Sequence, residues 1–142
     1  LPELWDFFTA LPTTVVVDHM GRPDVSLPVD GRQFELFVRL MREHENIWSK
    51  VSCPERLSVG GPKALNGEQA AYRDVVPFAK RIVETFPDRV LWGTDWPHPN
   101  LKDHMPDDGL LVDFIPHIAT TTELQKKLLV VNPMRLYWPE EP

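Results

Sequence analysis

The chain has 142 residues, of which 42% are hydrophobic and 25% charged, and its formal net charge is −6. This composition is typical of a globular domain that buries about two-thirds of its unfolded surface. The negative charge and the lack of a Lys/Arg run argue against a nucleic-acid partner, and no apolar run reaches the roughly 20 residues of a membrane span. Cys53 is the only cysteine, so an internal disulfide is excluded and a reducing, cytoplasmic compartment is favoured; we expect a buried strand-end thiol.

The first part of the chain predicts a helix, a strand and a second helix. Residues 4–11 have the crowded apolar pattern of a helix end that stops near Pro12. Residues 14–17 are a β-branched run without polar alternation, which is typical of a parallel strand covered on both faces. Residues 31–46 are predicted to be helical because apolar residues recur at spacings of three and four, and Asp30 is expected to cap this helix.

The middle of the chain predicts two more strands with a helix between them. Residues 47–52 and 89–93 are short, apolar at their centres and bounded by turn residues, as buried strands are. The loop at residues 58–67 is too long for a tight connection and is expected to be functional or mobile. Residues 68–86 read as helical, with Pro77 either bending the helix or starting a new one.

The last part of the chain predicts helices only. One is expected over residues 110–119, and another, capped by Thr121 or Thr122, through Val130. Residues 132–133, Asn-Pro, have the signature of a cap followed by a first-turn proline, which predicts one more helix.

Strand, polar loop and helix follow one another three times, which predicts an α/β fold with parallel strands. A closed (β/α)8 barrel needs eight strands and about 250 residues. With three strands and an opening leucine in place of methionine, residues 1–142 are expected to be the carboxyl-terminal portion of a (β/α)8 TIM-type barrel, and a fragment of a longer protein.

Polar side chains follow each predicted strand at the end where ligands bind in such folds. These candidate site residues are His19 and Arg22, then Arg56, then Asp95, His98 and Asn100. A carboxylate and an imidazole from different strands can activate a water molecule or bind a divalent metal ion. Two arginines suit an anionic substrate, because a guanidinium group binds a carboxylate through two hydrogen bonds.

Each of these groups also has a structural interpretation. A single histidine such as His19 is more often a satisfied structural residue than a catalyst, and Asp95 could cap a short helix. The two arginines could form ordinary surface ion pairs, Arg22 with Asp18 or Asp24 and Arg56 with Glu55. The functional interpretation therefore depends on the convergence of several groups at one end of the sheet.

Four segments of the chain resemble a branch of the amidohydrolase superfamily: residues 18–23, 89–98, 105–109 and 132–137. The sequence Trp-Gly-Thr-Asp-Trp-Pro-His at 92–98 marks the broad group. Its combination with Met-Pro-Asp-Asp-Gly at 105–109 is more specific, and is similar to the 2-pyrone-4,6-dicarboxylate and sulfomuconolactone hydrolases.

The resemblance implies a (β/α)8-barrel hydrolase that opens a polycarboxylated lactone in the degradation of aromatic compounds. Asp95 matches the aspartate that activates water in this family, and His19 matches a histidine that polarises the lactone carbonyl or its developing oxyanion. Arg22 and Arg56 match arginines that hold the carboxylates of the substrate. The pocket wall would be completed by His98 or Asn100.

The resemblance also bears on cofactors and partners. The resemblance to the pyrone hydrolases implies that the protein has no cofactor. Many other relatives use zinc or manganese. If this chain belongs to a metal-dependent hydrolase or decarboxylase of that kind, His19 and Asp95 are the expected metal ligands. The His-x-His pair of the family's first strand does not occur in this sequence. We therefore expect the amino-terminal half of the barrel, or a second copy, as a partner. A half-barrel that only binds small anions is a third hypothesis.

Overall fold

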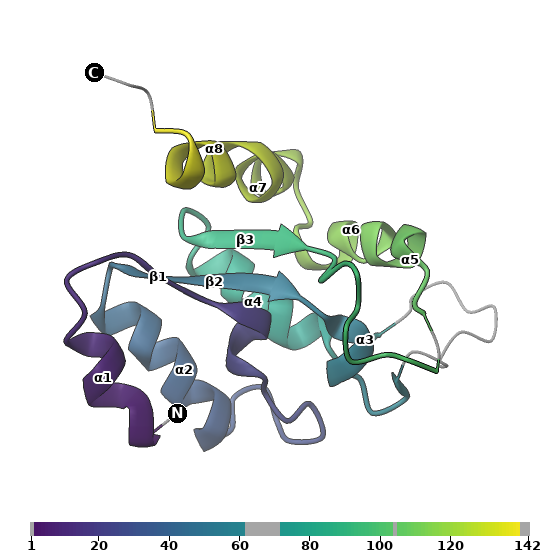
Figure 1. The fold of residues 1–142 in the computed structure, drawn as a ribbon, viewed down its shortest axis with the longest axis horizontal. Coiled ribbons are helices and arrows are strands. Elements are labelled where there is room, and N and C mark those ends of the chain that lie inside the picture. Colours follow the sequence, from purple (N-terminus) through teal and green to yellow (C-terminus); the bar gives the residue numbers. More distant parts are fainter. Residues whose placement is uncertain (1, 62–71, 104, 140–142) are drawn as a thin grey trace.

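The computed structural model describes residues 2–61, 72–103 and 105–139, and its centre is a three-stranded parallel sheet (Figure 1). The strand order follows the chain, with β2 in the middle and β1 and β3 on either side. The register pairs Val17 of β1 with Ser49, and Ser52 with Gly93 of β3. The strands are β1 (Val15–Val17), β2 (Ile47–Ser52) and β3 (Val90–Gly93).

Helices surround this sheet, and their positions follow the chain order (Figure 1). Helices α1 and α2 lie on the β1 side, and α7 and α8 lie beside β3. None of the helices in the described part of the chain has the length and apolar character needed to span a bilayer. The helical segments are η1 (Pro2–Leu4), α1 (Trp5–Thr9), η2 (Asp18–Gly21), α2 (Arg32–Glu43), α3 (Pro54–Leu57), α4 (Val76–Thr85), α5 (Asp108–Asp113), α6 (Ile115–Ile118), α7 (Thr122–Lys126), a π-helical turn (Lys127–Val131) and α8 (Asn132–Tyr137).

The hydrophobic core lies between the sheet and helices α2 and α4. Side chains alternate along β2, so Ile47 and Val51 face this core together with Val90 of β3. Phe34 and Phe78 contact each other across the two helices, with ring centroids 4.9 Å apart. By the same alternation Trp48, Lys50 and Ser52 share the opposite face of the sheet. The face that builds the core is therefore distinct from the face that reaches the candidate site.

The predicted strands are confirmed to within one residue at each end, and the prediction of parallel pairing is also confirmed. Helix α2 is shorter than predicted, because His44 adopts an extended conformation that leads the chain into β2. The cap prediction for Asp30 is wrong. Gly31 occupies the N-cap position, and no side chain caps the helix.

The long helix predicted over residues 68–86 is replaced by a shorter one. Residues 68–71 lie outside the described part of the chain, residues 72–75 form a turn, and α4 begins at Val76 with Pro77 in its first turn. The alternative in which Pro77 starts a new helix is therefore confirmed. Of the loop predicted at residues 58–67, only 58–61 are described.

The carboxyl-terminal helices differ from the prediction at Pro116 and at Asn132. Residues 110–119 form two short helices, because Pro116 has no N–H to continue the hydrogen-bond ladder of α5. Thr121 caps α7 as predicted, accepting a hydrogen bond from the backbone N–H of Leu124 at 3.2 Å. Asn132 is not a cap, because a π-helical turn leads directly into α8. The side-chain amide of Asn132 instead donates hydrogen bonds to the carbonyl oxygens of Pro87 and Val90, each at 2.8 Å.

Candidate functional site

The candidate site lies where the parallel strands end. Because all three carboxyl ends meet at one edge of the sheet, the segments that follow them are neighbours. His19 lies in η2 after β1, Cys53 and Arg56 follow β2, and Asp95 follows β3. In Figure 1 the arrowhead of β2 points toward α3, which carries Arg56, and the arrowhead of β3 points the same way along the sheet.

The backbone turns sharply directly after each strand. His19, Cys53 and Asp95 have φ angles of 54°, 64° and 67°, in the left-handed region that costs a non-glycine residue about 1–2 kcal/mol. Such conformations persist where the surrounding structure fixes them, and they concentrate at functional sites. Here they bring one polar side chain from each strand end to the same place.

The carboxylate of Asp95 is the centre of this cluster. Its Oδ2 lies 3.4 Å from Nη1 of Arg56 and 3.3 Å from Sγ of Cys53, and its Oδ1 lies 3.7 Å from Nε2 of His19. The side chain is 22% exposed, so solvent and small molecules reach it. A carboxylate between an imidazole and a guanidinium group can accept a proton from water while the two nitrogen groups bind negative charge.

His19 is held from its other side by the end of β2. Its Nδ1 lies 2.7 Å from the hydroxyl oxygen of Ser52. Burial lowers the pKa of the His19 imidazole and outweighs the opposing influence of the Asp95 and Asp18 carboxylates. The ring is therefore biased toward its neutral form.

Cys53 is a buried free thiol, as predicted. Burial, reinforced by the nearby Glu55 and Asp95 carboxylates, raises the pKa of the thiol far above its ordinary range. Because a thiolate is the nucleophilic form of cysteine, Cys53 is unsuited to nucleophilic attack at neutral pH. Its Sγ instead lies 3.3 Å from Asp95 Oδ2 and 3.6 Å from Glu55 Oε1, so its single S–H hydrogen can be donated to either carboxylate.

His98 is turned into the interior, where it joins α3 to the start of α5. Its Nε2 lies 3.0 Å from Oδ1 of Asp108, and its Nδ1 lies 3.4 Å from Oε1 of Glu55. The side chain of His98 is 1% exposed and that of Glu55 is fully buried. Burial raises the pKa of the Glu55 carboxyl. Glu55 therefore faces His98 and leaves Arg56 free to contact Asp95, contrary to the surface-pair alternative for these neighbours.

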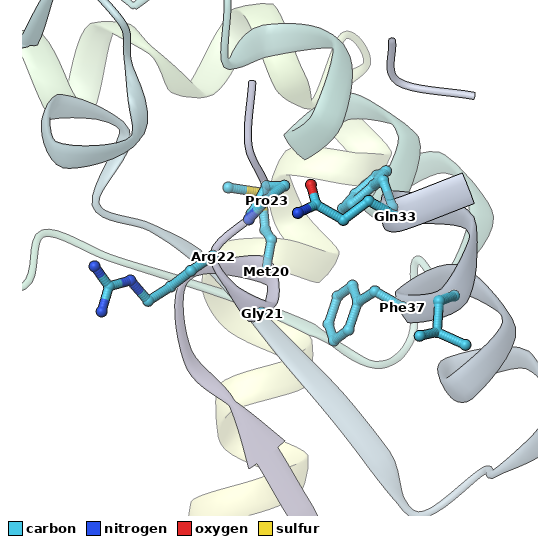
Figure 2. Close-up of a pocket in the computed structure, with 8 residues that line it drawn as sticks. Met20, Gly21, Arg22, Pro23, Gln33 and Phe37 are labelled. Atoms are coloured by element: carbon cyan, nitrogen blue, oxygen red, sulfur yellow. The ribbon is translucent and has the colours of Figure 1, made fainter. Parts of the chain in front are cut away.

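Arg22 and Asn100 are exposed on the segments that follow β1 and β3. Figure 2 shows the Arg22 side chain pointing away from Gln33 and Phe37, which line a cavity of about 330 Å³ between η2 and α2. Within the described residues no ion pair joins Arg22 to the carboxylates considered above. Asp18 binds Lys50 at 2.7 Å, and Asp24 accepts a hydrogen bond from Ser26.

Of the predicted site residues, direct contacts thus unite His19, Arg56 and Asp95. The sequence reasoning missed Ser52 and Glu55, which contact His19 and His98. The alternation of side chains along residues 47–52 was the available signal for Ser52, because it places this hydroxyl on the face opposite the core. No sequence pattern marked Glu55 as buried.

A protein-family model described as Amidohydrolase matches residues 1–138. The chain belongs to the amidohydrolase family. This amidohydrolase chain is 85% identical over 141 residues to a 2-pyrone-4,6-dicarboxylate hydrolase from Comamonas testosteroni, across 99% of the chain and 46% of that protein. It is 36% identical to a 4-sulfomuconolactone hydrolase from Rhizobium radiobacter, across 96% of the chain and 44% of that protein.

The fold of the amidohydrolase chain is also similar to part of a solved structure. An apo crystal structure of an Agrobacterium tumefaciens protein superposes with a TM-score of 0.74 at 25% identity, over 96% of this chain and 46% of that one. The chain thus spans about half the length of the curated relatives it matches. The expected α/β fold, in which the chain corresponds to about half of a barrel amidohydrolase, is confirmed.

Proposed function

We propose that this chain is the carboxyl-terminal half of a hydrolase that opens a polycarboxylated lactone such as 2-pyrone-4,6-dicarboxylate. The observation that carries the proposal is the accessible Asp95 carboxylate, held within 3.7 Å of His19 and within 3.4 Å of Arg56. The 85% identity to a protein named 2-pyrone-4,6-dicarboxylate hydrolase supports the choice of lactone.

In the proposed reaction Asp95 takes a proton from water while the water oxygen attacks the lactone carbonyl carbon. His19, whose Nε2 lies 3.7 Å from Asp95 Oδ1, stabilises the oxyanion that forms. The ring C–O bond then breaks, and the proton held by Asp95 passes to the leaving oxygen. Arg56 and Arg22 bind the substrate carboxylates, and their charge-assisted hydrogen bonds orient the ring.

The remaining predicted residues, His98 and Asn100, belong to the wall of this pocket in our proposal. Asn100 would contribute from its exposed position on the segment after β3. His98 would contribute from within, because its contacts with Glu55 and Asp108 fix the segment that leaves Asp95. The buried thiol of Cys53 supports a reducing, cytoplasmic setting.

The partner in this proposal is the amino-terminal half of the barrel, with a second copy of the chain as the alternative. Within the described residues β1 and β3 each pair with β2 alone, so each has one edge free for another strand. Large apolar side chains are also exposed near the carboxyl-terminal end: Val130 at 52%, Met134 at 52% and Trp138 at 64%. An additional half-barrel would cover both kinds of surface.

The test uses a protein that we name the reconstituted barrel, in which residues 1–142 replace the matching segment of the Comamonas testosteroni relative. We expect it to hydrolyse 2-pyrone-4,6-dicarboxylate, measured as loss of the pyrone absorbance, with the unaltered relative as the control. The 142-residue chain alone should be inactive and should associate, as measured by light scattering. A folded reconstituted barrel that binds the pyrone without hydrolysing it would contradict the proposal and favour a small-anion-binding protein.

A second candidate function is metal-dependent hydrolysis. Ligand atoms of His19, Cys53 and Asp95 lie within 4.8 Å of one another, close enough to approach one divalent ion such as zinc or manganese. Such an ion would supply Lewis-acid activation of water. The guanidinium group of Arg56, already 3.4 Å from the Asp95 carboxylate, opposes a second cation there. Metal analysis of the reconstituted barrel before and after chelation, with activity measured in parallel, distinguishes the two candidates.

A further inference from the structure

Ser52 is the last residue of the central strand, and the proposed reaction assigns it no role. Its side chain is buried, with the residue 1% exposed, and its hydroxyl oxygen lies 2.7 Å from Nδ1 of His19. Among the described residues, the hydroxyl group of Ser52 has this one hydrogen bond. Ser52 therefore meets the one ring nitrogen of His19 that faces away from Asp95.

A neutral imidazole carries its hydrogen on one of its two ring nitrogens, and the serine contact is compatible with either. If Nδ1 carries the hydrogen, it donates to the hydroxyl oxygen of Ser52, and Nε2 presents a lone pair. If Nε2 carries the hydrogen, Ser52 donates its hydroxyl hydrogen to Nδ1. The distance from Nδ1 to Ser52 alone does not distinguish the two arrangements, so the surroundings of Nε2 decide.

Nε2 of His19 lies 3.7 Å from Oδ1 of Asp95. A lone pair facing a carboxylate oxygen at this distance is repelled, whereas an N–H group facing it is attracted. Both side chains are largely shielded from solvent, at 15% and 22% exposure, so this difference is only partly screened. The geometry therefore favours the arrangement in which Nε2 carries the hydrogen.

We infer that Ser52 is a positioning residue, which donates its hydroxyl hydrogen to His19 Nδ1 and so keeps the imidazole hydrogen on Nε2, facing Asp95. The consequence for catalysis rests on the proposed function. An N–H group at Nε2 can donate to the developing oxyanion but cannot accept a proton from water, so Asp95 acts as the only base of the pair. The same hydrogen occupies the position through which Nε2 would bind a metal ion.

The hydrogen position is measured by nuclear magnetic resonance on the reconstituted barrel labelled with ¹⁵N-histidine at neutral pH. The two ring nitrogens of a neutral histidine differ in chemical shift according to which one carries the hydrogen, and His19→Asn assigns the signals by their loss. We expect a protonated Nε2 and an unprotonated Nδ1 at His19. A ring protonated at Nδ1, or at both nitrogens, would overturn the inference.

Activity provides the second measurement. Ser52→Ala should lower kcat by on the order of 10- to 100-fold with little change in KM, because the partly buried Nδ1 of His19 loses its hydrogen-bond donor and the ring is no longer held in one form. Ser52→Thr keeps the hydroxyl group and should recover most of the loss. The matched control is Ser49→Ala in the same strand, since the Ser49 hydroxyl is equally buried and has no hydrogen-bond partner among the described residues.

The two measurements separate the inference from the proposed function. If the barrel hydrolyses the pyrone but His19 is protonated at Nδ1, or if Ser52→Ala retains kcat within about twofold of the parent, the inference fails and the proposed function stands. If the barrel is inactive while His19 carries its hydrogen on Nε2, and Ser52→Ala disturbs that state but Ser49→Ala does not, the proposed function fails and the positioning role of Ser52 stands.

Discussion

Replacing Asp95 by asparagine tests the centre of the proposed mechanism. The amide has nearly the same shape as the carboxylate, so it can still fill the space between His19, Cys53 and Arg56. It cannot accept a proton from water, and it carries no charge to pair with Arg56. We expect Asp95→Asn to abolish most of the turnover of the reconstituted barrel while leaving it folded.

The structure sets the relative size of the two effects. Loss of a general base typically lowers a rate by about 10²- to 10⁴-fold, which corresponds to roughly 3–5 kcal/mol of barrier. The lost ion pair involves Arg56 at 3.4 Å, with the two side chains 18% and 22% exposed, and such partly solvated pairs contribute on the order of 1 kcal/mol to folding. The activation free energy of the reaction should therefore rise by more than the free energy of unfolding falls.

The assay is hydrolysis of 2-pyrone-4,6-dicarboxylate under saturating conditions, with thermal unfolding recorded on the same samples. Asp113→Asn is the matched control, because it makes the same chemical change at an exposed position in α5. A folded Asp95→Asn protein whose kcat stays within about threefold of the parent would refute the assignment of Asp95 as the base.

Three further predictions concern the arginines, a turn and an ion pair. Arg22→Met should raise KM about five- to tenfold with kcat nearly unchanged, whereas Arg56→Met should lower kcat as well, because Arg56 contacts Asp95, the proposed base; steady-state kinetics on both variants separate the two roles. Gly21→Ala should lower the free energy of unfolding by about 1–3 kcal/mol, seen as a lower Tm, because Gly21 has φ of 69° and a Cβ there would lie 3.1 Å from the Phe37 ring; an unchanged Tm would contradict this. Glu35→Gln should destabilise the fold by less than about 1 kcal/mol at neutral pH, because a hydrogen bond from Arg81 lowers the pKa of Glu35 below its ordinary 4.5. Since the folded pKa is the lower one, this contribution is complete above the ordinary pKa and is lost as pH falls through the depressed value, so denaturant unfolding of parent and variant should converge in acid.

The strands and their parallel pairing could be predicted because the signal is local. Residues 47–52 are apolar and bounded by turn residues, and the observed β2 has the same limits. The helices were less predictable where tertiary contacts override local preference. Asn132 has the sequence signature of a cap, but its amide is used to bind the carbonyl oxygens of Pro87 and Val90, more than 40 residues away.

The candidate site shows a similar division. The strand-end positions of His19, Arg56 and Asp95 follow from sequence order and parallel pairing alone. Which of their atoms meet does not, because left-handed backbone conformations at His19 and Asp95 aim these side chains. The buried position of Glu55 could not be predicted either, since it depends on a contact with His98, which lies in a loop 43 residues later in the chain (98 − 55).

The left-handed backbone conformations near the strand ends lower the stability of the fold, and they occur at residues that the proposed function needs. His19, Cys53, Asp95 and His98 all have φ between 54° and 67°, a conformation that glycine adopts without cost. At the partly exposed His19 and Asp95, a glycine substitution would relieve about 1–2 kcal/mol of backbone strain and at the same time delete a side chain of the site. Selection for thermal stability alone would therefore favour loss of these side chains, so laboratory evolution of a more stable protein should keep both positions fixed and vary the helical faces that pack on the sheet.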